Sequence, residues 1–131
     1  MSRKSKGINA ERELVHLFQQ NDWSAIRVAG SGSSKYPSPD VLAGNALRRL
    51  AIECKTLNRT KKYFSEEDID QLKQFARKFG TESWIGMKFK GMPWYFLNLE
   101  DLEKTGKNMA ISVDLAQKKG LKFEDLIEKQ G

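Results

Sequence analysis

Two short segments rich in strand-forming residues, 40–43 and 49–55, constrain the possible folds more than any other part of this sequence. Gly and Asn lie between them, which is typical of the turn of a β-hairpin. Three ionisable residues interrupt these otherwise ordinary strands, namely Asp40, Glu53 and Lys55. Because charged side chains are rarely buried without partners, their presence in a sheet needs an explanation.

Successive side chains of a strand point to opposite faces of its sheet, so residues two apart share a face. Glu53 and Lys55 therefore lie on the same face as Ala51, and the other face is apolar. The residues on that apolar face are Leu50, Ile52 and Cys54. We expect the apolar face to pack against the core and the charged face to point elsewhere.

The register of the hairpin follows if Gly44 pairs with Arg49 across a four-residue loop. The apolar pairs are then Val41 with Ile52 and Ala43 with Leu50. In the same register Asp40 lies opposite Glu53, with Cβ atoms about 4.5–5.5 Å apart. Two carboxylates at that separation repel each other, whereas a divalent cation between them would find the oxygen ligands that it prefers.

The charged residues of the hairpin admit two interpretations. Each of them alone is explained by an ion-pair cluster on a solvated face, which contributes little to stability. Together they favour a functional site, because Lys55 is directed at the same space as the two carboxylates and the small Ala51 lies beside them.

A first helix is expected over 9–23, with Asn9 as its N-cap. Its apolar residues recur at helical spacing and are Ala10, Leu14, Leu17 and Phe18. Glu11 lies in the first turn at the edge of this apolar face, so its carboxylate can reach the level of the sheet. A favourable interaction with the helix dipole explains an acid at this position equally well.

The remaining elements complete the pattern of a mixed α/β protein. They include a strand at 24–29, a turn-rich loop at 30–39, two strands at 83–89 and 93–99, and a short helix at 123–129. Between the hairpin and the last two strands, a second helix starts at the N-cap Ser65 and ends at Gly80. We therefore predict a single domain over 1–131, built as a mixed central β-sheet of about five strands flanked by helices.

The charge balance indicates what such a domain binds. The 131-residue chain has 23 Lys and Arg against 17 Asp and Glu, a formal net charge of +6. This favours a polyanionic partner, nucleic acid before membrane, although a basic protein without such a partner also fits. Cys54 is the only cysteine, so an internal disulfide is excluded. Because we find neither a secretory signal nor an apolar run of about 18 residues, we expect a cytoplasmic protein with no membrane partner.

The motifs resemble those of a known superfamily. "PD" at 39–40 followed by "ECK" at 53–55 is similar to the PD-(D/E)xK nuclease core. Several segments also resemble the archaeal Holliday junction resolvases, and the likeness extends to about Leu97. They are "GINAERELVHLF" at 7–18, "IRVAGSGSS" at 26–34, "PDVLAGN" at 39–45, "IECK" at 52–55 and "QLKQFARKFG" at 71–80.

The resemblance implies a metal-dependent endonuclease with a restriction-endonuclease-like core. Such an enzyme cleaves four-way (Holliday) DNA junctions by paired symmetric cuts during homologous recombination and repair. The family's catalytic positions correspond here to Glu11, Asp40, Glu53 and Lys55, and its important arginines to Arg12 and Arg27. A serine of the glycine-rich loop corresponds to Ser31 or Ser33, and the two remain alternatives because this loop is extended relative to the shortest family patterns.

A metal ion would join these carboxylates. Mg²⁺, for which Mn²⁺ should substitute, would be held by Asp40 and Glu53. Glu11 and the backbone carbonyl of Cys54 would be further ligands, and this set suffices for one ion or two. Lys55 would orient or activate the attacking water. No small-molecule cofactor is expected.

Basic residues outside the carboxylate group are expected to bind DNA phosphates. Arg12 and Arg27 carry guanidinium groups, whose fork matches phosphate oxygens, although Arg12 also fits a plain surface charge. Ser31 or Ser33 could bind phosphate or belong to a plain flexible loop. Further backbone contacts are expected from Lys4, Lys6, Arg59, Lys61 and Lys62. Such contacts would make binding sensitive to salt and tolerant of sequence, whereas solvated surface charges are the simpler explanation.

Paired cuts require two active sites, which a homodimer with two-fold symmetry would supply. The apolar stripe of the second helix is Ile69, Leu72 and Ala76, widened by two phenylalanines. We expect these phenylalanines, Phe75 and Phe79, to contribute to the dimer interface, with ordinary core positions as the equal alternative.

Two other functions remain open. One is a repair or restriction-type endonuclease of the same superfamily, which is disfavoured because no additional segment is large enough to read bases in a groove. The other is a non-catalytic DNA-binding module on the same fold. The complete set of Asp40, Glu53 and Lys55 argues against such a module.

Overall fold

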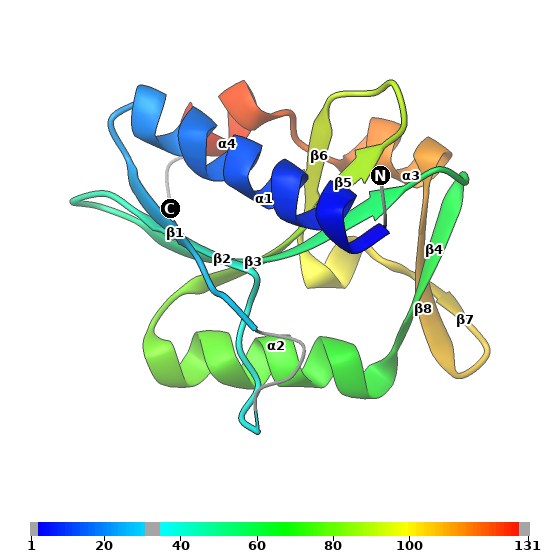
Figure 1. The fold of residues 1–131 in the computed structure, drawn as a ribbon. Coiled ribbons are helices and arrows are strands. Elements are labelled where there is room, and N and C mark those ends of the chain that lie inside the picture. The colour runs from blue at the N-terminus through cyan, green and yellow to red at the C-terminus, as the bar shows by residue number, and fades with distance from the viewer. Residues whose placement is uncertain (1–2, 31–34, 129–131) are drawn as a thin grey trace.

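The chain folds around a five-stranded mixed sheet with helices on both faces, as seen in a computed structural model (Figure 1). The structure describes residues 3–30 and 35–128. The strand order is β1-β2-β3-β5-β6, in which β3 and β5 are parallel and the other neighbours antiparallel. These strands are β1 (Ser24–Arg27), β2 (Val41–Gly44), β3 (Arg49–Leu57), β5 (Glu82–Phe89) and β6 (Trp94–Leu97). The predicted fold class is confirmed.

The helices divide the core into two layers. Figure 1 shows α1 (Arg3–Gln20) and α4 (Phe123–Glu128) on one side of the sheet and α2 (Glu66–Phe79) on the other. Leu50, Ile52 and Cys54 pack in the layer under α1, as the alternation of β3 predicts. Ala51 is also fully buried, because the face that it shares with Glu53 and Lys55 is covered by α2 along part of its length.

The hairpin of β2 and β3 has the predicted register. Gly44 pairs with Arg49, and the apolar pairs are Val41 with Ile52 and Ala43 with Leu50. Asp40 directly precedes β2, and its N–H donates to the carbonyl oxygen of Ile52 at 3.1 Å. The alternation of apolar residues was sufficient to set this register, because a shift by one residue would have exposed the whole apolar set.

α1 begins at Arg3, not at Asn9, so the predicted N-cap is wrong and Asn9 lies inside the helix. No proline precedes Asn9, and each residue added to an existing helix gains one backbone hydrogen bond. The predicted apolar face is otherwise correct, since Leu14 and Phe18 are fully buried.

α2 has the predicted ends. Ser65 accepts a hydrogen bond from the Asp68 N–H at 3.0 Å, and the Asp68 side chain accepts one from the Ser65 N–H at 3.3 Å. This reciprocal capping box satisfies two donors that the first turn leaves without partners inside the helix. At the other end Gly80 adopts φ 85, a left-handed conformation that favours glycine.

A second, three-stranded sheet was not predicted. Its order is β4-β8-β7, and it stands beside the main sheet next to the start of α2 (Figure 1). The strands are β4 (Lys61–Ser65), β7 (Glu103–Thr105) and β8 (Asn108–Ser112). The sequence shows no clear pattern in β4, because Phe64 is its only buried residue. A short 3-10 helix, η2 (Leu99–Asp101), and α3 (Val113–Lys119) complete the described elements.

Arg48 in the hairpin turn is a buried cation, with only 6% of its surface exposed. Its guanidinium group donates to both carboxylate oxygens of Glu82, at 2.8 and 2.9 Å, and to the Leu126 carbonyl at 2.6 Å. It also lies 5.5 Å from the centre of the Trp23 ring. These contacts tie the hairpin to β5 and to α4.

Within residues 3–30 and 35–128, none of the helices is long and apolar enough to cross a membrane.

Candidate active site

Asp40 directly precedes β2 and is held there by backbone and side-chain hydrogen bonds. Its backbone bonds to strands on both sides, because its N–H donates to Ile52 and its carbonyl accepts from the Val28 N–H at 2.8 Å. Its Oδ2 atom accepts from the backbone N–H of Cys54 at 2.8 Å. The carboxylate is therefore fixed against β3, next to the strand segment that carries Glu53.

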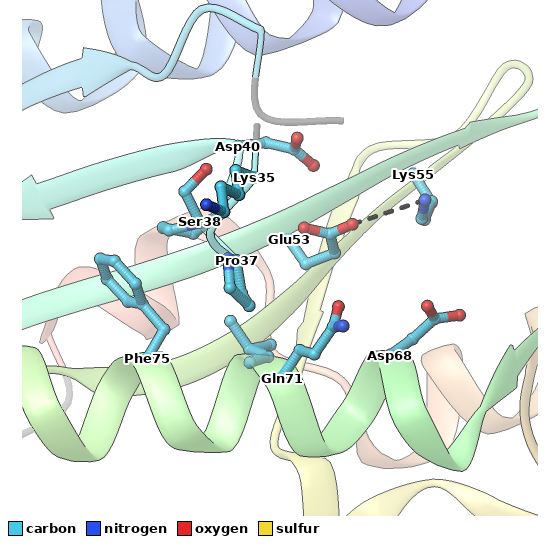
Figure 2. A pocket seen from close by; sticks show the side chains of 11 residues that line it. Lys35, Pro37, Ser38, Asp40, Glu53, Lys55, Asp68, Gln71 and Phe75 are labelled. Carbon is cyan, nitrogen blue, oxygen red and sulfur yellow. Dashed lines mark ion pairs between the residues drawn. The ribbon is translucent and has the colours of Figure 1, made fainter. Parts of the chain in front are cut away.

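Glu53 and Lys55 project from β3 into the space between this strand and α2, as Figure 2 shows. The Lys55 Nζ atom lies 3.5 Å from the Glu53 Oε2 atom, and both side chains are about one-third exposed, at 34% and 31%. Asp40 comes just before β2, and its carboxyl group shares a hydrogen bond with that of Glu53. The two acids and the lysine that the sequence predicted to share one space are thus brought together.

The two carboxyl groups influence each other strongly. Burial, followed by the negative charge of Asp40, raises the pKa of Glu53 to about 7 from its usual 4.5. The charge of Lys55 acts in the opposite direction, and a hydrogen bond with Asp40 favours the protonated form of Glu53. Glu53 therefore retains its proton to a higher pH than an ordinary glutamate does.

Glu11 approaches this group from α1. Its Oε1 atom lies 3.6 Å from the Nη1 atom of Arg27 on β1, and its side chain is only 15% exposed. Burial, followed by the charge of Asp40, raises the pKa of Glu11, while Arg27 and Lys55 lower it. The structure therefore brings Glu11 into the electrostatic field of Asp40, as its position on the helix predicted, with Arg27 beside it.

The donor set fits a divalent cation in part. Asp40 and Glu53 supply two hard oxygen donors whose mutual repulsion a cation would relieve. Among the residues that the structure describes, no three Cys, His, Asp or Glu side chains are grouped closely enough to hold a metal ion. Glu11 faces Arg27, so its role as a third ligand stays a prediction.

Cys54 presents two different groups. Its thiol is buried in the core layer under α1, as expected, and burial raises the pKa of this thiol well above its usual value. Its N–H points to Asp40, and a strand residue directs its N–H and C=O to the same side. The Cys54 carbonyl is thus directed to the side of Asp40, as the predicted ligand set requires.

The acids and the lysine lie at a pocket of about 480 Å³ (Figure 2). The first helical turns of α2 form one wall, from which Asp68 and Gln71 face Glu53. Lys35 and Ser38 of the preceding loop form another wall. Sequence reasoning missed these four residues as site residues. The spacing of three residues between Asp68 and Gln71 was a usable signal, because it places both on one helix face with Leu72 and Phe75.

A second pocket of about 470 Å³ adjoins the first, and Lys55 lines both. Its basic residues come from three elements, since Lys6 lies on α1, Arg59 on the turn after β3 and Lys62 on β4. Burial, followed by the positive charges of Lys55 and Arg59, lowers the pKa of Lys62. Three of the predicted DNA-binding residues therefore converge beside Lys55.

Other predicted DNA-binding residues lie elsewhere. Arg12 is exposed on α1, where it lines a different pocket together with Glu13 and His16. Lys61 lies on the opposite face of β4 from Lys62, with its Nζ atom 5.4 Å from the centre of the Tyr63 ring. Lys4 is exposed and lines neither of the two pockets beside Lys55. Ser31 and Ser33 fall outside the described residues.

The two phenylalanines predicted for a dimer interface form one stack. The rings of Phe75 and Phe79 are 5.1 Å apart and nearly parallel, at 15°. Phe75 is half-buried and lines the pocket at Asp40, whereas Phe79 is 59% exposed. An ordinary core position is therefore excluded for Phe79.

The chain is similar to known proteins over most of its length. Residues 2–131 match the family model described as archaeal Holliday junction resolvase (Hjc). A protein of Archaeoglobus fulgidus named crossover junction endodeoxyribonuclease Hjc is 43% identical over 108 residues, which is 82% of this chain and 79% of the relative. A protein of Methanocaldococcus jannaschii with the same name is 36% identical over 133 residues, 93% of this chain and 96% of the relative.

A solved structure is similar as well. The structure of Archaeoglobus fulgidus Hjc, described as a Holliday junction resolvase from an archaeal hyperthermophile, matches with a TM-score of 0.85 at 37% identity. The match covers 91% of this chain and 96% of that chain. The sheet and its flanking helices are therefore an arrangement that a solved relative shares.

Proposed function

This chain belongs to the archaeal Holliday junction resolvase family and is a crossover junction endodeoxyribonuclease, and we propose that it hydrolyses junction DNA at the group of Asp40, Glu53 and Lys55. One observation carries this assignment of residues. The two carboxyl groups share a hydrogen bond, and the Lys55 ammonium lies 3.5 Å from Glu53, at a pocket that adjoins a basic one.

Nucleases of this family depend on a metal ion, and we propose Mg²⁺, with Mn²⁺ as a substitute. Asp40 and Glu53 would hold it, with the Cys54 carbonyl and Glu11 as further candidate ligands. When bound, the ion polarises the phosphate and lowers the pKa of water at the site. The raised pKa of Glu53 supports this proposal, because the negative charge of Asp40 that contributes to it would also attract a metal cation.

The other residues have proposed roles in positioning the DNA strand. Lys55 would orient the attacking water and offset the negative charge that develops on the phosphate. Arg27 would bind a phosphate oxygen once the strand competes for its contact with Glu11. Arg12, Ser31 or Ser33, and the basic residues of the chain remain proposed backbone contacts.

Paired cuts require a second copy of the site, so we propose a homodimer with two-fold symmetry and Phe75 and Phe79 in its interface. The exposed stack of these two rings supports this placement. A single nuclease domain over 1–131, a cytoplasmic location and the absence of a small-molecule cofactor remain predictions from the sequence.

One experiment tests the proposal. The protein is incubated with a labelled four-way junction, a linear duplex and a flap, each with Mg²⁺ and with a chelator. We expect symmetric paired cuts in the junction alone, and we expect the chelator to stop cutting while binding persists. Cutting of duplex or flap at the same rate would instead support a repair or restriction-type endonuclease.

The variant Asp40→Asn separates catalysis from binding. It keeps the side-chain volume and an oxygen that can accept from Cys54, but it removes the charge. We expect cleavage to fall at least about 100-fold, as for the loss of one electrostatic stabiliser, with junction affinity near that of the wild type. Lost affinity would indicate that Asp40 has a structural role, and unchanged cleavage would contradict the assignment.

A further inference from the structure

The two pockets that meet at Lys55 differ in charge. The first is lined by the acids Asp40, Glu53 and Asp68 together with the cations Lys35 and Lys55. Besides Lys55, the second is lined by the cations Lys6, Arg59 and Lys62, and none of its described lining residues is acidic. A DNA strand whose scissile phosphate lies at the carboxylates therefore has a cationic pocket immediately beyond Lys55.

The basic pocket is preformed by the backbone around Arg59. The carbonyl oxygen of Leu57, at the end of β3, accepts from the Lys90 N–H at 2.9 Å. The carbonyl oxygen of Thr60, just before β4, accepts from the Val113 N–H at 2.9 Å. The turn that carries Arg59 is thus held at both ends, so a ligand would not have to order it.

The alternation of β4 separates its two lysines. Lys62 shares a face with Phe64, which is only 3% exposed, and this face is directed to the pocket. Lys61 lies on the other face beside Tyr63. Two neighbouring residues of one strand thus carry the same charge, and only one of them lines the pocket.

The cations of the pocket repel one another. Burial, followed by the positive charges of Lys55 and Arg59, lowers the pKa of Lys62, and the negative charge of Asp68 offsets this only in part. An anion in this pocket would relieve the repulsion. A phosphodiester group fits because it carries one negative charge and two free oxygens for cationic donors.

We propose that Lys6, Arg59 and Lys62 form a subsite for the phosphate that neighbours the scissile phosphate on the cleaved strand. The inference rests on the proposed function, because it takes Asp40 and Glu53 as the place of cleavage. β3 runs in one direction from Glu53 past Lys55 to the pocket, so the bound phosphate lies on the same side of every cut. The subsite thus fixes the polarity of the strand over the carboxylates.

The experiment combines protein variants with DNA that lacks one charge. A set of junctions is prepared in which a single phosphate near the cut is replaced by a neutral methylphosphonate. Junction affinity is measured for the wild type, Lys62→Ala and Lys61→Ala, the last being the matched control on the other face of β4. Lys62→Arg retains the charge and tests whether charge alone restores affinity.

We expect Lys62→Ala to weaken binding about tenfold, as for the loss of one charged hydrogen bond, and to reduce the salt slope by about one. Neutralising one phosphate adjacent to the cut should weaken junction binding by the wild type by the same factor, and it should not weaken binding by Lys62→Ala further. Lys61→Ala should show no such coupling to any single phosphate. Lys62→Arg should bind like the wild type and retain the coupling.

Two results would overturn the subsite. In the first, the loss of affinity caused by Lys62→Ala adds to the loss caused by every neutral linkage, so the two are independent. In the second, Lys61→Ala shows the same coupling to a neutral linkage as Lys62→Ala. Circular dichroism of each variant confirms that it is folded before its affinity is compared. Failure of the proposed function gives a different result, because the wild type would then leave the unmodified junction uncut.

Discussion

At the scale of single residues, the protein treats its buried and half-buried charges in two different ways. Arg48 is surrounded by partners, with both oxygens of Glu82 and the Leu126 carbonyl in hydrogen-bonding contact. Asp40 and Glu53 instead lie close together, and burial, followed by the charge of Asp40, raises the pKa of Glu53 to about 7. Because the same fold satisfies Arg48 fully, we interpret the neighbouring carboxylates as a feature retained for binding a cation and not as a defect of packing.

This interpretation predicts how stability depends on pH in the metal-free protein. The folded state retains the Glu53 proton up to about pH 7, whereas the unfolded state releases it near the usual pKa of 4.5. The free energy of unfolding therefore falls as the pH rises between these two values. Glu53→Gln cannot ionise and so avoids this loss of stability. The melting temperature of the variant should equal that of the wild type near pH 4 and should be a few degrees higher near pH 8.

Thermal unfolding at both pH values, with chelator present, checks this prediction. The exposed acid Glu103 provides the control, since Glu103→Gln should shift the melting temperature equally at both. Added Mg²⁺ should then stabilise the wild type near pH 8 but not Glu53→Gln. A difference between Glu53→Gln and wild type that is constant from pH 4 to pH 8 would contradict the raised pKa.

At the scale of elements, the start of α2 serves both the fold and the site. Asp68 completes the capping box with Ser65 and also lines the pocket opposite Glu53. The cap therefore determines where this wall of the pocket stands relative to β3. β4 ends at Ser65, so the same residue also joins the small sheet to the helix.

Removal of this cap should destabilise the protein measurably. Ser65→Ala leaves the Asp68 N–H without its side-chain acceptor, and the expected loss in free energy of unfolding is about 1 kcal/mol. Ser65→Asp should retain most of the stability, because Asp is an equally good N-cap. Urea unfolding followed by circular dichroism measures both variants, and an unchanged midpoint for Ser65→Ala would show that the cap contributes nothing.

The elements also show which features a single sequence can predict. The β2–β3 register and the ends of α2 depend on neighbouring residues, so alternation and capping residues were enough to find them. The second sheet pairs β4 with β8, in a register that runs from Lys61 with Ser112 to Ser65 with Asn108, so the partners are far apart along the chain, and β4 buries only Phe64. Local patterns carry no information about such a pairing.

The same division holds for the site. Asp40, Glu53 and Lys55 belong to one hairpin, so their proximity followed from the register. The sequence assigned Glu11 and Arg27 to the same site but did not predict their ion pair, because that contact depends on how α1 crosses β1. The basic pocket depends on three separate elements, and the sequence could not separate Lys62, which lines it, from Lys61, which does not.

At the scale of the whole molecule, an apolar surface continues from the pocket at Asp40 around the end of α2. Phe75 lines the pocket at Asp40, and its stacking partner Phe79 lines a small, mostly apolar pocket of about 220 Å³. Ile26 on β1, which is 60% exposed, and Leu42 on β2 line that same pocket. β1 is also an edge strand, which makes this side of the sheet suited to contact with a second copy.

The proposed homodimer predicts that this surface determines the oligomeric state. Phe79→Asp places a charge on the exposed ring position, and burying that charge against a second subunit would be unfavourable. We expect this variant, and Phe75→Ala combined with Phe79→Ala, to sediment as monomers, whereas Leu47→Ala at the exposed hairpin turn should sediment like the wild type. A monomer carries only one copy of the proposed active site, so the two cuts in a junction should become independent nicks. A folded Phe79→Asp dimer that still makes paired cuts would mean that the interface lies on another face.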